Sequence, residues 1–291
     1  MAGDGEKKQS SELGGGQVPE VAADVFAEQA GSIELLWGDR GRPSRGPKPA
    51  LSLDRITRTA IALADTGGLA AVSMQRIAGE LNFTKMSLYR YVPGKTELVA
   101  LMIDTAMGAP PALHTDAGWR AALRAWAESL SAVLHRHPWL LSATMGPRVM
   151  GPNELGWTES ALTALADTGL NGAEQLDAVV VVNGHIRALA QIATSMGVGS
   201  TRTQGAAHGA TRNPEQAMSA ALNELLAGRS DRYPALTAAV ASSAVGDSRD
   251  QALEFGLERI LDGLESYMAR RAAQDDTAVA PGEASSPGSA R

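Results

Sequence analysis

The chain contains no cysteine, and this absence excludes several classes of site. Without thiols the protein has no disulfides, no thiolate nucleophile and no cysteine-ligated zinc finger. No run of about 18 apolar residues occurs, which is the length that a membrane-spanning helix needs, and the N-terminus lacks the apolar core of a signal peptide. We therefore expect a cytoplasmic protein without a membrane partner.

Recognisable catalytic and metal-binding patterns are also missing. His135 and His137 fall on different sides of a helix, and no carboxylate or third ligand stands at metal spacing. The glycines of GVGST, residues 197–201, follow a predicted helix rather than a strand and lack the lysine of a phosphate-binding loop. We predict that the protein is not an enzyme and uses no cofactor and no metal.

What the chain does have is an uneven distribution of charge. The net formal charge is −6, yet residues 40–95 contain ten Lys or Arg and only three Asp or Glu, a local charge of +7 that leaves −13 elsewhere. A basic segment on an acidic protein indicates a surface that binds nucleic acid.

The basic segment ends in the stretch SMQRIAGELNFTKMSLYRYVPGK, residues 73–95. Ser73 is a suitable N-cap for one short helix, and Thr84 for a second helix over Lys85–Tyr91 that buries Leu88. The second helix turns long polar, basic and aromatic side chains outward, which has little structural purpose. Two helices joined by a tight turn, the second decorated in this way, form the unit that enters the DNA major groove.

Residues 51–107 closely resemble the DNA-binding domain of tetracycline-repressor-type (TetR family) regulators, and SLYRYVPGK is the most specific part of the match. The runs HRHPWL, GPNELGW and FGLERILDGLE resemble the tetracycline-repressor-like C-terminal domain of the same family. The resemblance implies an all-α fold, in which a three-helix helix-turn-helix domain is linked by a fourth helix to an all-helical ligand-binding and dimerisation domain.

Composition and helical spacing divide the chain into four parts. Residues 1–48 form a mostly disordered extension, in which residues 21–37 make a short docked helix or nothing stable. Its end, with Arg40, Arg42, Arg45 and Lys48, is either a solvated linker or a basic arm that reaches the minor groove or phosphates. The helix-turn-helix domain spans 49–108, the helical body 117–271 and a disordered tail 272–291.

Within these parts we expect a helix over 53–66 capped by Ser52, and a linking helix over 95–107. The body helices are expected near 117–135, 138–145, 153–167, 172–196, 213–227, 233–244 and, capped by Ser248 and Gln251, 248–271, with a mobile loop at 197–212. Asn171 and Glu174 form a capping box for the long helix.

The family pattern implies base-edge contacts by the first exposed residues of the recognition helix, which are Lys85, Met86, Ser87 and Arg90. It places Gln75 within reach of a base or the backbone, and it assigns phosphate contacts to Thr84, Tyr89, Tyr91 and Lys95. Arg and Lys suit guanine, and Met suits the thymine methyl group. The alternative for Tyr89 and Tyr91 is packing between the helices, and the two roles can coexist.

The body carries candidates for an effector site, because a small-molecule site is usually an apolar cavity with a few polar groups. These candidates are Trp126, Trp139, Met145, Trp157, Asn183 and His185; for each, simple core packing is the competing interpretation. The helix over 172–196 has apolar residues on two sides, and Gly256 and Gly263 lie one heptad apart in the final helix, where a partner backbone could approach. This pattern indicates a four-helix homodimer interface, or else ordinary packing within the chain.

Together these features predict a sequence-specific transcriptional regulator that binds double-stranded operator DNA as a homodimer. We expect a repressor that a small-molecule effector releases from a palindromic operator. The alternative is a DNA-binding regulator or architectural protein without a small-molecule ligand.

Overall fold

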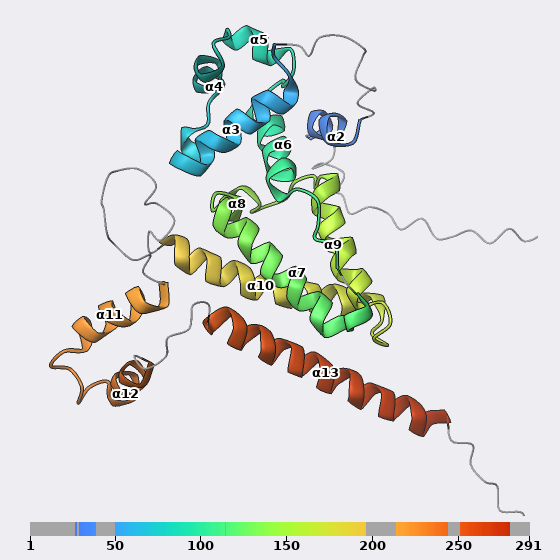
Figure 1. The fold of residues 1–291 in the computed structure, drawn as a ribbon, viewed down its shortest axis with the longest axis vertical. Coiled ribbons are helices and arrows are strands. Elements are labelled where there is room, and N and C mark those ends of the chain that lie inside the picture. Colours follow the sequence, from blue (N-terminus) through green and yellow to red (C-terminus); the bar gives the residue numbers. More distant parts are fainter. Residues whose placement is uncertain are drawn as a thin grey trace, which may run out of the picture.

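In the computed structural model the chain is all-helical over the residues that the structure describes, which are 27, 29–38, 50–113, 115–195, 214–243 and 251–279. The basic arm at 40–48 and the predicted loop at 197–212 lie outside these residues. The expected all-α fold is confirmed, with a compact head at the top of Figure 1 and a larger helical body below it.

The head contains α3 (Leu53–Gly67), the 3-10 turn η1 (Leu69–Ala71), α4 (Met74–Leu81) and α5 (Lys85–Tyr89). Its helices begin where the predicted caps stand. The hydroxyls of Ser52, Ser73 and Thr84 accept hydrogen bonds from the backbone N–H three residues on, at 3.2, 3.2 and 3.3 Å. Asn82 ends α4 in the left-handed conformation, with φ 58°, which permits the tight turn into α5.

The link between head and body is α6 (Lys95–Met107), with the predicted bounds. The body follows as α7 (Trp119–Arg136), α8 (Leu140–Ala143), α9 (Pro152–Leu165) and α10 (Gly172–Ser195), with a 3-10 turn η2 (Thr115–Ala117) before α7. The long α13 (Gln251–Val279) packs along α10 at the foot of the molecule (Figure 1). It continues eight residues beyond the predicted end at Arg271.

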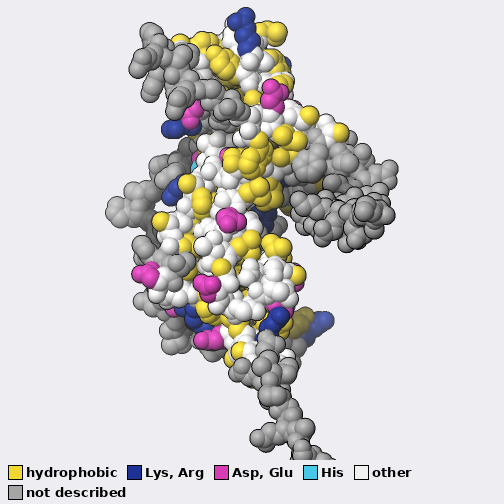
Figure 2. Space-filling view, turned by 90° about the vertical axis from the view of Figure 1, so that its right-hand side faces the viewer, with side chains coloured by type: hydrophobic (Ala, Val, Ile, Leu, Met, Phe, Trp, Pro, Cys, Tyr) yellow, Lys and Arg dark blue, Asp and Glu magenta, His cyan; other side chains and the backbone are white. Residues whose placement is uncertain are grey.

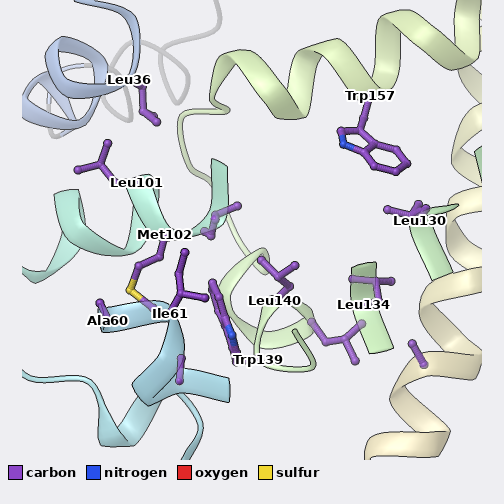
Figure 3. Packing of buried hydrophobic residues seen from close by; sticks show 14 of the residues in the cluster. Leu36, Ala60, Ile61, Leu101, Met102, Leu130, Leu134, Trp139, Leu140 and Trp157 are labelled. Atoms are coloured by element: carbon purple, nitrogen blue, oxygen red, sulfur yellow. The ribbon is translucent and has the colours of Figure 1, made fainter. Parts of the chain in front are cut away.

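One hydrophobic core runs through both parts. Figure 3 shows Ala60 and Ile61 of α3 near Met102 of α6, and Trp139 and Leu140 continuing the same cluster toward Leu134 and Leu130 of α7. Because these side chains are buried against one another, the head and the body share a single core. The orientation of the head is therefore coupled to the packing of α6 and α8.

A helix that precedes the head docks on this link. Of the two alternatives for residues 21–37, the structure has a short helix, α2 (Ala30–Trp37), packed on α6 with Leu36 buried. The Trp37 indole donates to the Met150 carbonyl at 3.0 Å, and the Gln29 amide bonds both the Pro147 carbonyl and the Val149 N–H. The sequence placed this helix in a mostly disordered extension; tertiary bonds to residues more than 110 positions away hold it in place.

The remaining helices are α11 (Pro214–Leu226) and α12 (Pro234–Ser243), which pack mainly on each other beside the body (Figure 1). Among the described residues, α10 alone is long and apolar enough to qualify as a membrane-spanning helix by composition. Core helices of soluble proteins pass the same test, and α10 packs against α7, α9 and α13.

Candidate DNA interface and effector site

The recognition helix α5 is short, and buried side chains on its inner side anchor it to the head. Leu88 and Val92 are fully buried in the head, whereas Met86 on the outer face is 72% exposed. The helix ends at Tyr89, two residues before the predicted end, and the Val92 N–H still bonds the Leu88 carbonyl at 3.0 Å. Pro93 disfavours helical backbone at the residue before it, so the chain leaves the helix there.

The predicted DNA contacts fall into two groups by exposure. Exposed side chains are those of Gln75, Thr84, Lys85, Met86, Arg90 and Lys95, while Ser87, Tyr89 and Tyr91 are half-buried. Both tyrosines pack against the core cluster, as the packing interpretation predicted. The Ser87 hydroxyl lies 2.9 Å from the Thr84 hydroxyl within the helix cap, and Lys85 Nζ lies 5.6 Å from the centre of the Tyr89 ring. The outer surface therefore combines three flexible cations, a thioether and the rims of two phenols.

The charge asymmetry is partly visible on the surface. On the face shown in Figure 2, a basic side chain projects at the tip of the head, and acidic side chains are spread over the body. One basic residue of the head is neutralised locally, because Arg58 pairs with Asp54 at 2.9 Å. The first turn of α6 begins after Gly94, which has no side chain to cap it, and it carries both Lys95 and the acidic Glu97.

The C-terminal half of α6 is bonded to α9. The buried Asp104 carboxylate accepts from the Asn153 backbone N–H at 2.8 Å and from the Asn153 amide at 3.1 Å. A Cβ on Gly151 would lie 2.2 Å from Asp104 Oδ1, so only glycine permits this approach. Sequence reasoning missed Asp104 because its partner lies 49 positions away.

Two of the predicted effector residues reinforce this link instead of lining a cavity. Trp126 and Trp157 are buried and meet edge to face, with ring centres 6.1 Å apart. The Trp157 indole donates to the carbonyl of Gly108 at 3.1 Å, just past α6, and the Trp126 indole donates to the Trp157 carbonyl at 2.8 Å. Trp126 and Trp157 are therefore packed in the core, which was the competing interpretation for both residues.

Trp139 and Met145 do line a cavity, of about 730 Å³, between the head and the body. The same cavity is lined by Asp65 of α3, which connects the two parts. One Asp65 oxygen accepts from the Trp139 indole at 2.8 Å and from His137 Nδ1 at 2.7 Å. Since a carboxylate cannot donate, Nδ1 of His137 must carry the proton. Asp65 and His137 are site residues that no local pattern in the sequence marks.

Asn183 and His185 lie on α10, away from that cavity. The His185 ring packs on Gly256 of α13, where a Cβ would lie 2.2 Å from the ring. The close approach predicted at Gly256 is thus made within the chain. His185 Nε2 is buried and has no hydrogen-bond partner among the described residues. Gly263 lies one heptad further along α13 and is exposed. A Cβ added there would meet no atom within 4 Å among the described residues.

Arg187, also on α10, fixes the position of α8. It donates to the Leu141 carbonyl at 3.0 Å and to the Thr144 hydroxyl at 2.9 Å. Burial, and secondarily the nearby Arg148, lowers the pKa of Arg187 from its ordinary value. Because α8 follows directly on Trp139, this arginine holds the body wall of the cavity in place.

A set of large apolar side chains on α10 and α13 remains exposed in the single chain. The set comprises Leu176, Val180, Val181 and Ile192 on α10 and Phe255 and Tyr267 on α13. We call this set the α10–α13 face. Exposed apolar residues gathered on adjacent helices are common at protein–protein contacts.

Comparisons with known proteins agree with this geometry. The family profile described as "Bacterial regulatory proteins, tetR family" matches residues 56–102, and the one described as "Tetracyclin repressor-like, C-terminal domain" matches residues 110–268. These two matches correspond to the head with α6 and to the body with α13.

Two relatives extend over most of the chain. The HTH-type transcriptional repressor DrrR1 of Streptomyces coeruleorubidus is 38% identical over 272 residues, which cover 90% of this chain and 95% of the relative. An HTH-type transcriptional regulator of Saccharopolyspora erythraea is 30% identical over 219 residues, 74% of this chain and 86% of its own. Among solved structures, apo ActR of Streptomyces coelicolor has a TM-score of 0.61 at 24% identity, covering 77% of this chain and all of ActR, and it supports the fold.

Proposed function

We propose that this chain, which belongs to the TetR family of bacterial regulatory proteins and is a DNA-binding transcriptional regulator, acts as a ligand-released repressor. A homodimer would hold a near-palindromic operator with two recognition helices, and a small molecule would release it. The observation that carries the proposal is the 38% identity to a transcriptional repressor over nine tenths of the chain.

The DNA contacts are proposed from the exposure of α5 and its neighbours. Lys85, Met86 and Arg90 are exposed on or just after α5 and are assigned to base edges, with Gln75 at the margin. Lys95 is assigned to a phosphate, together with the hydroxyls of Thr84, Tyr89 and Tyr91. Ser87 is assigned to a base edge, which requires its hydroxyl to leave Thr84.

Dimerisation is proposed through the α10–α13 face. Two copies packed on this face would form a four-helix interface and cover apolar side chains that one chain leaves in water. Two heads are also needed for tight binding, because half-sites on one side of the duplex lie about 34 Å apart, or a multiple of that.

Release is proposed through α6. Its N-terminal end packs in the head, and its C-terminal end is tied to the body where Asp104 accepts from Asn153 and where the Trp157 indole donates to Gly108. A ligand that prefers one arrangement of these contacts by a few kcal/mol would shift the separation of the heads and weaken DNA binding by the same free energy.

A gel shift with the full-length protein tests the proposal, using the DNA upstream of its own gene and a shuffled sequence of the same composition. We expect binding to the upstream DNA that excess shuffled DNA does not displace and that a member of an amphipathic small-molecule panel abolishes. Salt-sensitive binding of both DNAs with equal affinity would support the architectural alternative and contradict the repressor.

A further inference from the structure

The cavity between head and body is built from elements of both parts. The head contributes the end of α3 and η1, residues 64–69, and the body contributes α8 with its flanks and the last turn of α10. Its volume, about 730 Å³, lies within the range of small-molecule sites. Any occupant would touch the head and the body at once.

The apolar part of the lining favours a flat ring system. Leu69, Leu141 and Met145 line the cavity together with the Trp139 ring. The indole N–H of Trp139 is bonded to Asp65, which restricts the orientation of the ring. Trp139 is 5% exposed, so a small part of a fixed aromatic ring borders the cavity, and the flexible Met145 side chain, 72% exposed, can pack on a planar ligand beside it.

The polar part of the lining consists almost wholly of acceptors. The hydroxyls of Thr66, Ser142, Thr194 and Ser195 each donate their proton to a carbonyl of their own helix, at 2.8 to 3.1 Å. They can offer a ligand only lone pairs. The Gln191 amide is the exception, since it can both donate and accept.

Among the described residues that line the cavity, the single charged side chain is an anion. Asp65 is 31% exposed, and its bonds to His137 and Trp139 use the same oxygen, so the carboxylate retains capacity to accept from a ligand. A negative ligand would meet this charge and a row of acceptors, whereas an ammonium group would find its partner there.

We propose that this junction cavity is the effector site, and that it takes an amphipathic molecule with a planar apolar portion and a protonated amine directed at Asp65. The claim that the bound molecule is an effector rests on the proposed function, whereas the claim that the cavity binds it does not. The amine bonds the acceptor capacity that His137 and Trp139 leave on Asp65, so an occupant acts directly on the carboxylate that ties the head to the body and changes how the head is held.

Two naphthyl probes of similar size and opposite charge test the chemistry: 1-naphthylmethylamine and the 1-naphthylacetate anion, titrated into the full-length protein by calorimetry. We expect the amine to bind about tenfold more tightly than the carboxylate, as one added charge-assisted hydrogen bond would give. Asp65→Asn keeps the size and an acceptor oxygen but removes the charge, and it should reduce this preference to about threefold or less.

A blocking variant locates the site. Thr194→Trp places an indole in the cavity and should abolish the binding of both probes. Thr163→Trp is the matched control, because Thr163 is also exposed and its hydroxyl makes the same bond to the carbonyl four residues back, but on α9 outside the cavity. It should bind both probes as the wild type does.

Equal affinity of the wild type for the two probes, or amine binding that survives Thr194→Trp, would overturn the proposal. If Thr194→Trp fails to fold, as judged by its melting curve, the Asp65→Asn comparison decides alone. Operator binding by the wild type, measured without probes, separates the two claims. Normal operator recognition without amine preference contradicts the site only, and amine preference without operator recognition contradicts the proposed function only.

Discussion

At the scale of single residues, the head separates buried side chains that anchor α5 from exposed side chains that we propose contact DNA. Leu88 and Val92 are fully buried and fix α5, while Arg90 and Lys95 are exposed and make no ion pair among the described residues. Removing one of the latter should therefore change DNA binding without changing stability. The two cations are assigned different partners, a base edge and a phosphate.

Arg90→Ala should weaken binding to the operator by about 1–3 kcal/mol and leave binding to random DNA nearly unchanged. Lys95→Ala should weaken both equally and lower the slope of log K against log salt by about 0.9 for each phosphate that the lysine neutralises. Fluorescence anisotropy over a salt series measures both quantities. Equal losses on operator and random DNA for Arg90→Ala would refute its base contact.

Glu174 joins the start of α10 to the end of α13, and its ionisation should be visible in the pH dependence of stability. A hydrogen bond from the Tyr267 hydroxyl at 2.7 Å lowers the pKa of Glu174 below its ordinary value of 4.5, with further lowering by the Asn171 N–H and by Arg271. A lowered folded-state pKa means that the stabilisation is complete above pH 4.5 and is lost as the pH falls through the folded value.

Glu174→Gln should therefore lower Tm at pH 7 and show a smaller further fall below pH 4.5 than the wild type does. Thermal melts between pH 7 and 3 measure this difference. Glu159→Gln, an exposed glutamate on α9, should follow the wild-type curve. Parallel curves for Glu174→Gln and wild type would show that the lowered pKa is not a stabilising feature.

At the scale of elements, the bonds between α6 and the body are the contacts proposed to transmit a change between the parts. Asp104 accepts from the first turn of α9 and thereby fixes the C-terminal end of α6. Gly151→Ala would place a methyl group on that carboxylate, although the backbone there, at φ −84°, accepts alanine without strain. The cost of the substitution is thus steric and local.

We expect Gly151→Ala to destabilise the fold by about 1–3 kcal/mol, in the range of core overpacking, and to weaken operator binding beyond that loss. Gly172→Ala is the control, since an added Cβ there meets no atom within 4 Å and alanine favours a helix. Denaturant unfolding and anisotropy measure the two effects. If the Gly151→Ala protein were as stable as the control, Asp104 would not be a residue that fixes α6 to the body.

Local features of this fold were predictable from the sequence, and long-range ones were not. Ser52, Ser73, Thr84 and the Asn171–Glu174 box cap their helices as predicted, because a cap bonds residues three apart. By contrast, the bonds of Asp65 and Asp104 join residues separated by 49 to 74 positions.

The effector candidates show the same limit. Aromatic composition identified Trp126, Trp139 and Trp157 together, although only Trp139 lines the junction cavity. Whether a tryptophan lines a cavity or fills the core depends on how α8 and α9 pack, and no spacing within either helix encodes that packing.

At the scale of the whole molecule, the α10–α13 face is the proposed dimer interface. Val180 of this face is 66% exposed in the single chain. Val180→Arg would place a charge in the proposed interface and should convert the dimer to monomers, as measured by sedimentation equilibrium. Leu155→Arg, at an exposed leucine of α9, should remain dimeric. A Val180→Arg dimer of unchanged affinity would place the interface elsewhere.

Whether two copies of α5 read a symmetric DNA site is tested most directly by selection from a random DNA pool with the full-length protein. We predict enrichment of inverted half-sites whose centres lie about 10 base pairs apart, or a multiple of that, and a loss of base preference at one position per half-site with Arg90→Ala. Recovery of unenriched DNA, or of a preference that Arg90→Ala leaves intact, would contradict this reading of the operator by α5.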